Sequence, residues 1–301
     1  MPVAARCLGS LMIVLAAAVP GVAGGAKPAQ GEYVVRGDGV VPVTVGNVGG
    51  RMRITPWAPA APTLNPDYAQ RIGLKGGFFG FSVKVGPVKV RGETGVTRLQ
   101  FGNASFKRRV VWFERRYDAG ADGAVGPGGL PVDVIRFQLK PDTGNERTAT
   151  LPMVQQMFRP TTTRVMIAGR AIMIYFDPQH PRTLATAGAG AALAEGLGGQ
   201  LSGSGDKAEI AFGITRPVRT IRLSRPLVVG PLTLESMQVR IGDNGSVAGI
   251  ADADADPDEI VVTAKSKKDR RDVIIIGRDQ LGSCSSIVFD KKAKTIRLSC
   301  V

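Results

Sequence analysis

The sequence has few histidines, cysteines and aromatic residues, and few long apolar runs. Its 301 residues include one histidine, three cysteines and 6% Phe, Trp and Tyr. Metal centres need clustered His, Cys or acidic ligands, and no such cluster can be traced, so we expect neither a metal nor another cofactor. The formal net charge is +14, but no basic stripe with interleaved aromatics accompanies it, which argues against nucleic-acid binding. We interpret the charge as a basic surface suited to anionic envelope surfaces.

The one long apolar run lies within residues 1–26. Arg6 precedes this run, Pro20 and Gly21 interrupt it, and small residues suited to cleavage follow it. These features are typical of a secretory signal peptide and differ from those of a membrane span. No second long apolar stretch follows in the sequence. We therefore expect a periplasmic or secreted protein whose mature chain has no integral membrane span.

The cysteines fit an exported protein. Cys7 lies in the expected signal, which leaves Cys284 and Cys300. The residues between these two alternate around a lysine-rich centre, which predicts a hairpin with Phe289 opposite Thr295 and the two cysteines opposite each other. Because exported chains meet an oxidising compartment, this register predicts a disulfide. Two free thiols are the alternative.

Glycine and proline are abundant, and they separate short runs rich in Val, Ile and Thr. These runs, with 39 glycines and 20 prolines, indicate a mostly β protein. Only two segments have helical features: one begins at Pro66 after Asn65, and the other covers residues 187–199. Residues 252–271 change from acidic to basic along their length, and we expect them to form a charged, flexible insertion.

Several motifs occur twice in the same order. The first has two prolines, then Thr-Leu and an alanine-containing helix; the second contains Val-Gly-Pro; the third is an apolar pair before glycine with a leucine after it. The paired ranges are 55–77 with 177–199, 85–92 with 229–236, and 123–130 with 274–281. Such a repeat predicts two lobes of similar fold, an N-terminal lobe at 27–150 and a C-terminal lobe at 151–301.

This order of motifs resembles the retropepsin-like aspartic proteases, and its doubling resembles the two-lobed, pepsin-like arrangement. The motifs that carry the resemblance are Thr63-Leu64-Asn65-Pro66 after the first loop, Ala124-Val125-Gly126 with Leu130, and Ile275-Ile276-Gly277 with Leu281. The resemblance implies a mostly β fold of two acid-protease β-barrel lobes with a cleft between them. If such a protein is active, the family implies an aspartic-type endopeptidase.

The expected catalytic loops are where the chain departs from this family. An aspartic protease needs two carboxylates about 3 Å apart that share one proton, each in an Asp-Thr-Gly loop. Here the first lobe has Thr55 in place of aspartate and Trp57 in place of glycine, whereas the second lobe keeps Asp177. The resemblance therefore implies a single remaining dyad residue. We expect Asp177 to be exposed and to titrate near its ordinary pKa; an aspartate that only starts a turn is the alternative.

The other residues of the two loops would line the cleft. In the second lobe Pro178, Gln179 and His180 replace Thr-Gly-Ala, and in the first lobe Pro56 and Trp57 follow the threonine. We expect these five residues to contact a bound peptide or protein. His180 could replace a general acid or base beside the aspartate, although we favour a surface position because no nucleophile or metal-ligand cluster accompanies it.

Other acidic stretches have structural interpretations. Residues 142–144 read Asp-Thr-Gly, but polar residues flank them on both sides, so we interpret them as a turn. Asp118 lies in a loop before the late motif, and Asp122 lies at the start of that motif. The alternating acids at 252–256 lack the glycine and the glutamate of a calcium-binding loop.

Three functions remain open. The first is a catalytically degenerate aspartic-protease-like protein that binds extended peptide or protein in the inter-lobe cleft. The second is an active aspartic endopeptidase that uses Asp177 with an unidentified second carboxylate. The third is an envelope partner protein, because residues 258–264, DEIVVTA, resemble the TonB box, which pairs with its partner as an added strand. An ordinary strand or linker is the alternative for that segment.

Overall fold

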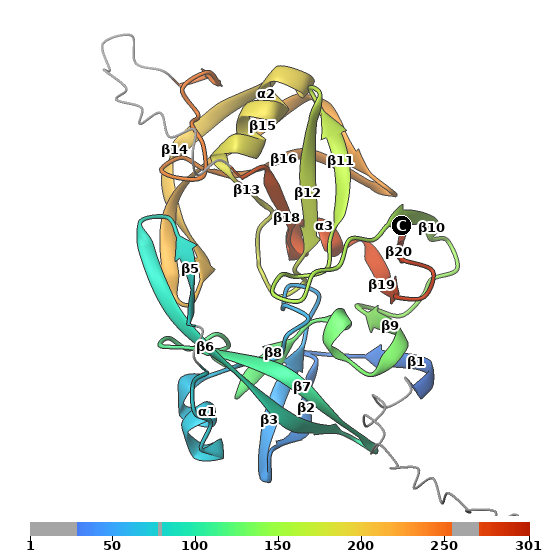
Figure 1. The fold of residues 1–301 in the computed structure, drawn as a ribbon. Helices are drawn as coiled ribbons and strands as arrows, with labels where there is room; N and C mark the ends of the chain where they lie inside the picture. Colours follow the sequence, from blue (N-terminus) through green and yellow to red (C-terminus); the bar gives the residue numbers. More distant parts are fainter. Residues whose placement is uncertain (1–28, 78–79, 255–270) are drawn as a thin grey trace, which may run out of the picture.

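The computed structural model describes residues 29–77, 80–254 and 271–301 (Figure 1). Strands make up most of the described chain, which confirms the predicted mostly β fold. The expected signal at 1–26 and the TonB-box-like segment at 258–264 lie outside the described residues. Within the described part of the chain, no helix is both long enough and apolar enough to cross a bilayer.

The first half of the chain forms a closed six-stranded barrel with a projecting hairpin. The order around the barrel is β2-β3-β8-β4-β7-β6, and β2 pairs again with β6 to close it. Strand β5 pairs with the start of β6 and forms the hairpin. The strands are β2 (Val40–Val45), β3 (Val48–Ile54), β4 (Thr63–Leu64), β5 (Phe81–Val85), β6 (Val88–Phe101), β7 (Ala104–Phe113) and β8 (Gly123–Val125).

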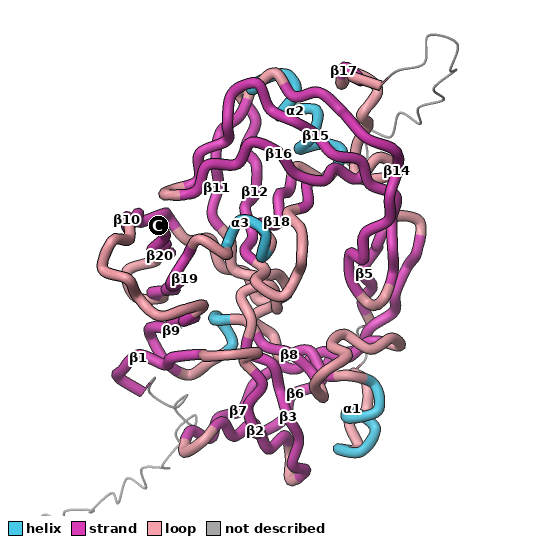
Figure 2. The backbone as a smooth tube through the Cα atoms, turned by 180° about the vertical axis from the view of Figure 1, so that it is seen from behind, coloured by secondary structure: helices cyan, strands magenta, loops and turns pink. Residues whose placement is uncertain are grey.

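The second half forms an eight-stranded sheet in the order β11-β12-β18-β13-β16-β15-β14-β17. Two long strands, β14 and β15, make a hairpin that extends toward β5 (Figures 1 and 2). The strands are β11 (Thr163–Ile167), β12 (Arg170–Phe176), β13 (Leu184–Ala185), β14 (Gly199–Ala211), β15 (Ile214–Val229), β16 (Leu232–Arg240), β17 (Ala251–Asp252) and β18 (Val273–Ile276).

A third sheet contains strands from both halves. Its order is β1-β9-β19-β20-β10, so the late strand β19 of the second half pairs directly with β9 of the first. Buried side chains of these strands, such as Phe137 and Phe289, pack edge to face and join the two halves into one apolar core. The strands are β1 (Ala29–Val35), β9 (Val132–Gln138), β10 (Arg147–Pro152), β19 (Cys284–Asp290) and β20 (Thr295–Cys300).

The two halves repeat one order of elements. In the first half Ile54, the last residue of β3, pairs in parallel with Val125 of β8. In the second half Phe176, the last residue of β12, pairs in parallel with Ile276 of β18. Next in each half comes a short strand, which pairs antiparallel with β8 in the first half (β4) and with β18 in the second (β13). A helix follows that short strand in both halves. This correspondence agrees with two of the repeated motifs, 55–77 with 177–199 and 123–130 with 274–281.

The match between residues 85–92 and 229–236 is wrong. The first range turns between β5 and β6, whereas the second turns between β15 and β16. By order of elements, β15 and β16 correspond to β6 and β7. The shared Val-Gly-Pro letters have a local cause, because Gly86 and Gly230 both have positive φ, +61° and +59°, as tight hairpin turns require.

Both predicted helices are present. Helix α1 (Pro66–Ile72) begins with proline after Asn65 and ends at Gly73, whose φ of +72° favours glycine. Helix α2 (Ala187–Leu197) is capped by Thr186, whose hydroxyl accepts a hydrogen bond from the backbone N–H of Ala189. Two short helical turns, η1 (Pro127–Gly129) and α3 (Arg278–Leu281), follow β8 and β18 respectively.

The C-terminal hairpin has the predicted disulfide but a shifted register. Cys284 lies opposite Cys300, and their sulfur atoms are 2.05 Å apart. The expected pairing of Phe289 with Thr295 is wrong, because Phe289 lies opposite Ile296. A bulge between residues 284 and 286 adds one residue to β19 and thereby brings the cysteines into register.

The predicted insertion at 252–271 begins with an ordered residue. Asp252 belongs to β17 and pairs with Arg219, which lowers its pKa through a hydrogen bond and opposite charge. The guanidinium holds the carboxylate at this first position, and the flexibility expected for the insertion stays a prediction. Residues 255–270 lie outside the described residues.

Candidate functional site

The loops that follow β3 and β12 face each other, as the repeat predicts. Thr55 and Asp177 occupy corresponding positions: the N–H of Thr55 donates to the carbonyl of Val125 at 3.1 Å, and the N–H of Asp177 donates to that of Ile276 at 2.9 Å. The two loops touch through the hydroxyl of Thr55, which donates to Oε1 of Gln179 at 2.6 Å. A threonine and an aspartate therefore stand where the resemblance implies two aspartates.

Asp177 is buried, and the expectation of an exposed carboxylate with an ordinary pKa is wrong. It is 7% exposed, and Oδ1 accepts hydrogen bonds from the backbone N–H groups of Gln179 and His180 at 3.1 and 3.3 Å. Burial raises its pKa, although these bonds and the positive charges of His180 and Arg53 oppose the shift. Pro178 indicates a turn, and the carboxylate of Asp177 does accept hydrogen bonds from the backbone of that turn. The burial of Asp177, however, could not be predicted from the turn, because it depends on the tertiary structure.

The loop that faces Asp177, residues 55–59, contains no carboxylate. Thr55 is also buried, at 5% exposure, and its hydroxyl does not ionise in the useful range. Among the described residues, no carboxylate shifts the pKa of Asp177. The carboxylate of Asp118 accepts from Nε of Arg53 at 2.6 Å, so a guanidinium already pairs with it. The loops thus contain one carboxyl group where shared-proton chemistry needs two.

His180 is held between the second loop and β14. Its Nδ1 lies 2.5 Å from the carbonyl oxygen of Arg182, and its Nε2 lies 3.0 Å from that of Glu209. The imidazole is half-buried rather than on a free surface. Because backbone oxygens face both ring nitrogens, the geometry favours a structural role over a general acid or base.

The late-motif glycines bring each loop close to the neighbouring backbone. A Cβ on Gly126 would lie 2.0 Å from the carbonyl oxygen of Ala58, and a Cβ on Gly277 would lie 2.4 Å from that of Arg182. No side chain fits at either position. The two glycines therefore act alike in the two halves, and they fix both loops against β8 and β18.

The other acidic stretches are structural. The Asp-Thr-Gly at 142–144 is exposed, and Glu146 accepts from the N–H groups of Thr143 and Gly144, as expected for a turn. Asp122 accepts from the N–H of Arg51 and pairs with Arg71. Asn65 orders the loop that contains Asp118, because its side chain donates to and accepts from that loop's backbone.

A pocket of about 630 Å³ lies between the two halves beside these loops. Its aromatic lining comes from both: Trp57 packs edge to face on Tyr175 at 5.6 Å, and Phe113 packs on Phe212 at 4.8 Å. Tyr117 contacts Phe212 at 5.5 Å and points its hydroxyl toward the carbonyl of Trp57. Burial raises the pKa of Tyr117 above its usual range, so the phenol stays protonated.

The β14–β15 hairpin forms one wall of the pocket. Its turn residue, Phe212, has a φ of 58°, in the left-handed region that a bulky residue rarely adopts. The ring is 8% exposed and belongs to an apolar cluster with Val85, Val90 and Phe113 of the first half. This cross-lobe contact holds the hairpin against β5–β7 and covers that side of the pocket.

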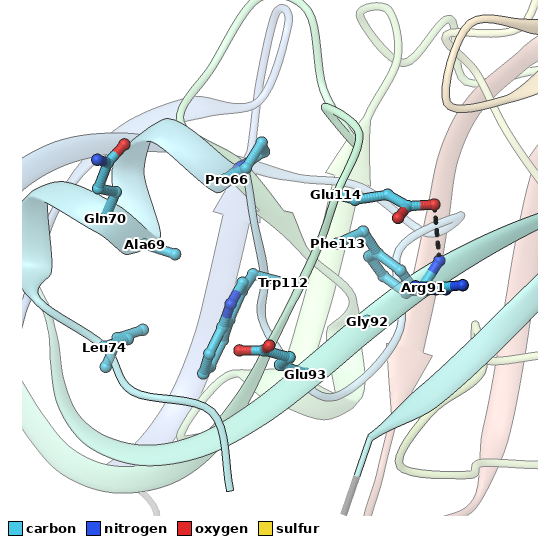
Figure 3. Close-up of a pocket in the computed structure, with 10 residues that line it drawn as sticks. All are labelled: Pro66, Ala69, Gln70, Leu74, Arg91, Gly92, Glu93, Trp112, Phe113 and Glu114. Atoms are coloured by element: carbon cyan, nitrogen blue, oxygen red, sulfur yellow. Dashed lines mark hydrogen bonds between the residues drawn. The ribbon is translucent and has the colours of Figure 1, made fainter.

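A smaller pocket of about 410 Å³ lies within the first half (Figure 3). Residues of α1 and of strands β6 and β7 line it, including Ala69, Glu93 and Trp112. Glu114 accepts from the backbone N–H of Arg91 at its edge. Neither facing loop contributes to its lining, so we place the candidate site in the larger pocket.

No protein-family model matches the chain, and no curated protein matches its sequence. Among the described residues, no group of three or more His, Cys, Asp or Glu is placed to hold a metal ion. The assignment of function therefore rests on the geometry of the loops and of the larger pocket.

The expected binding residues are distributed unevenly. Of the five, only Trp57 lines the larger pocket. Pro56 is buried, and Gln179 is exposed and bonded to the other loop. Neither Asp177 nor Thr55 lines the pocket. The peptide contacts of Pro56, Pro178, Gln179 and His180 stay predictions.

Sequence reasoning missed most of the pocket. Tyr117, Tyr175, Phe212 and Arg240 line it, and they come from a loop, two strands and a hairpin turn that are far apart in the chain. No local spacing connects them. The low aromatic content of the chain does not reveal that several of these rings converge.

Proposed function

We propose that this protein is an exported, catalytically degenerate relative of the two-lobed retropepsin-like proteases, and that it binds extended peptide or protein between its lobes. The single observation that carries the proposal is that Thr55 corresponds to Asp177 while its hydroxyl bonds to Gln179. One carboxyl group can hold or release a proton, but it cannot supply the paired acid and base of the shared-proton mechanism.

The binding half of the proposal is supported by the larger pocket. A cavity of about 630 Å³ with aromatic walls from both lobes has the size and lining usual for ligand sites. Strand β5 lies at the edge of its sheet and lines the pocket. This suits an extended chain, because such chains bind by adding to sheet edges with side chains in pockets. An oxidising compartment outside the cytoplasm also agrees with the proposal, since Cys284 and Cys300 lie at disulfide distance.

A second candidate is an active endopeptidase that uses Asp177. The raised pKa of this buried carboxyl favours it, since a catalytic acid must keep its proton. Against it stands the position of Asp177, which does not line the pocket. The third candidate, action through residues 258–264, lies outside the described residues and stays a prediction.

One experiment separates these functions. The mature protein, from residue 27 on, is incubated with a fluorescently labelled, unstructured protein, and binding and fragment release are followed together. We expect binding without fragments, and equal binding by Asp177→Asn. Trp57→Ala should weaken binding, because it removes a ring from the pocket wall. Phe106→Ala is the control, because Phe106 is an equally half-buried ring that does not line that pocket. The absence of any binding would overturn the proposal.

A further inference from the structure

The lining of the larger pocket contains cations and no carboxylates. Lys84, Arg159, Arg240 and Arg271 line it, and the lining has no Asp or Glu. Among the described residues, no ion pair involves Lys84, Arg159 or Arg271. These three side chains are exposed, so they form a charged rim around the aromatic walls.

One cation lies deep in the pocket wall. Arg240 is buried, with its side chain 8% exposed, and its Nε has no hydrogen-bond partner among the described residues. Its Nη2 lies 2.5 Å from Oδ1 of Asp243, and Nε of Arg216 lies 2.7 Å from Oδ2 of the same carboxylate. Two guanidinium groups thus share one carboxylate, which leaves a net positive charge in this wall.

The cations lie close to the aromatic residues. The positive charges of Arg159 and Arg271 both act on Tyr175, where they oppose the rise in pKa caused by burial. At the mouth, Phe158 is 51% exposed and lies 6.0 Å from Phe81 on the β5–β6 hairpin. An apolar side chain can therefore pack against the exposed ring of Phe158 while neighbouring carboxylates reach the cations.

We propose that the pocket binds an extended acidic segment of a partner protein, in which an apolar or aromatic side chain is flanked by carboxylates. This inference rests on the proposed function, because it names the class of peptide that the inter-lobe pocket takes. Charge complementarity decides the occupant: the rim cations repel basic segments, and a neutral segment gives these cations no ionic partner.

The test uses three labelled peptides of equal length, with leucine alternating with aspartate, serine or lysine. Binding to the mature protein is measured by fluorescence anisotropy at low and high salt. We expect the aspartate peptide to bind about tenfold or more tighter than the serine peptide at low salt, and this preference to shrink at high salt. The lysine peptide should bind most weakly.

Matched variants separate the pocket from the overall charge of the protein. Lys84→Glu with Arg159→Glu should weaken aspartate-peptide binding about tenfold and leave serine-peptide binding unchanged. Arg98→Glu with Arg164→Glu makes the same change of net charge at exposed positions outside the pocket, and it should change affinity less than about twofold. Melting curves check that both variants fold.

Each outcome decides between the proposals. Equal binding of the aspartate and serine peptides, or equal loss in the two double variants, overturns the acidic preference and leaves the proposed peptide binding intact. If no peptide binds, the proposed function itself fails. Dodecanoate is tested in the same way. If it binds, loses affinity in the pocket double variant and keeps affinity in the control double variant, while no peptide binds, the ligand is an anionic amphiphile and both proposals are overturned.

Discussion

The hydroxyl of Thr55 donates to Oε1 of Gln179 at 2.6 Å, across the two loops that face each other between the lobes. If the protein is related to the aspartic proteases as we propose, Thr55 stands in the position of a catalytic aspartate and Gln179 in that of the loop glycine. The hydrogen bond between them joins the two halves of the chain. Under that proposal, the two residues that replace parts of the catalytic loops also hold the loops together.

The first prediction concerns activity. We expect no pepstatin-sensitive cleavage of a denatured protein substrate at roughly pH 3 to 7. Thr55→Asp alone should not restore it, because the amide of Gln179 can turn to donate to the new carboxylate, and Trp57 keeps its place against Tyr175. Gel electrophoresis of the digest is the measurement, and Asp177→Asn is the control. Cleavage that vanishes in Asp177→Asn would contradict the non-catalytic interpretation.

The second prediction concerns the pH dependence of stability. Because burial raises the pKa of Asp177 in the folded state, the folded state binds this proton more tightly than the unfolded state. The group therefore costs stability above its folded pKa, and this cost disappears as pH falls to its unfolded value. Asp177→Asn should raise the urea midpoint at neutral pH, with a gain that shrinks in acid.

The matched control for this variant is Asp142→Asn, which changes an exposed carboxylate in a turn. It should not show the same pH-dependent gain. A loss of stability in Asp177→Asn at neutral pH would mean that the charged form of Asp177 contributes to folding, contrary to the argument from burial.

The third prediction concerns the late-motif glycines. Gly126→Ala and Gly277→Ala should each lower the free energy of unfolding by about 3 kcal/mol, because the new Cβ would meet a backbone oxygen at 2.0 or 2.4 Å. Gly49→Ala is the control, since nothing lies within 4 Å of its added Cβ, and its effect should stay within about 0.5 kcal/mol. Urea unfolding measures all three, and similar values would refute the close approach.

The fourth prediction concerns the C-terminal hairpin. The bond between Cys284 and Cys300 closes a short loop, with a sequence separation of 16, and its removal should lower the free energy of unfolding by about 3 kcal/mol. The Cys284→Ser, Cys300→Ser double variant in urea measures this loss. Reductant should destabilise the natural protein and have no further effect on the double variant. Two titratable thiols in the unreduced protein would show that the bond does not form.

The sequence alone determined the features that depend on local order. Gly and Pro between Val/Ile/Thr runs indicated strands, Asn65-Pro66 and Thr186 marked the starts of helices, and the alternating hairpin residues paired the cysteines. The repeated loop and glycine motifs placed Thr55 opposite Asp177. These inferences hold because periodicity, capping and turn chemistry act over a few residues. The repeated motifs allow the same local interpretation to be applied to the second half of the chain.

Tertiary structure decided everything that depends on which surfaces meet. It buries Asp177, although an aspartate before a proline is typical of an exposed turn. Burial depends on which distant segments pack around the carboxyl group, and the local sequence does not record that. It places the two Val-Gly-Pro turns in hairpins that do not correspond in the two halves. A turn motif specifies only its own few residues, whereas the order of strands in a sheet depends on the whole fold. It also assembles Tyr117, Tyr175, Phe212 and Arg240 around one pocket, because folding brings distant strands together and no spacing in the chain records that meeting.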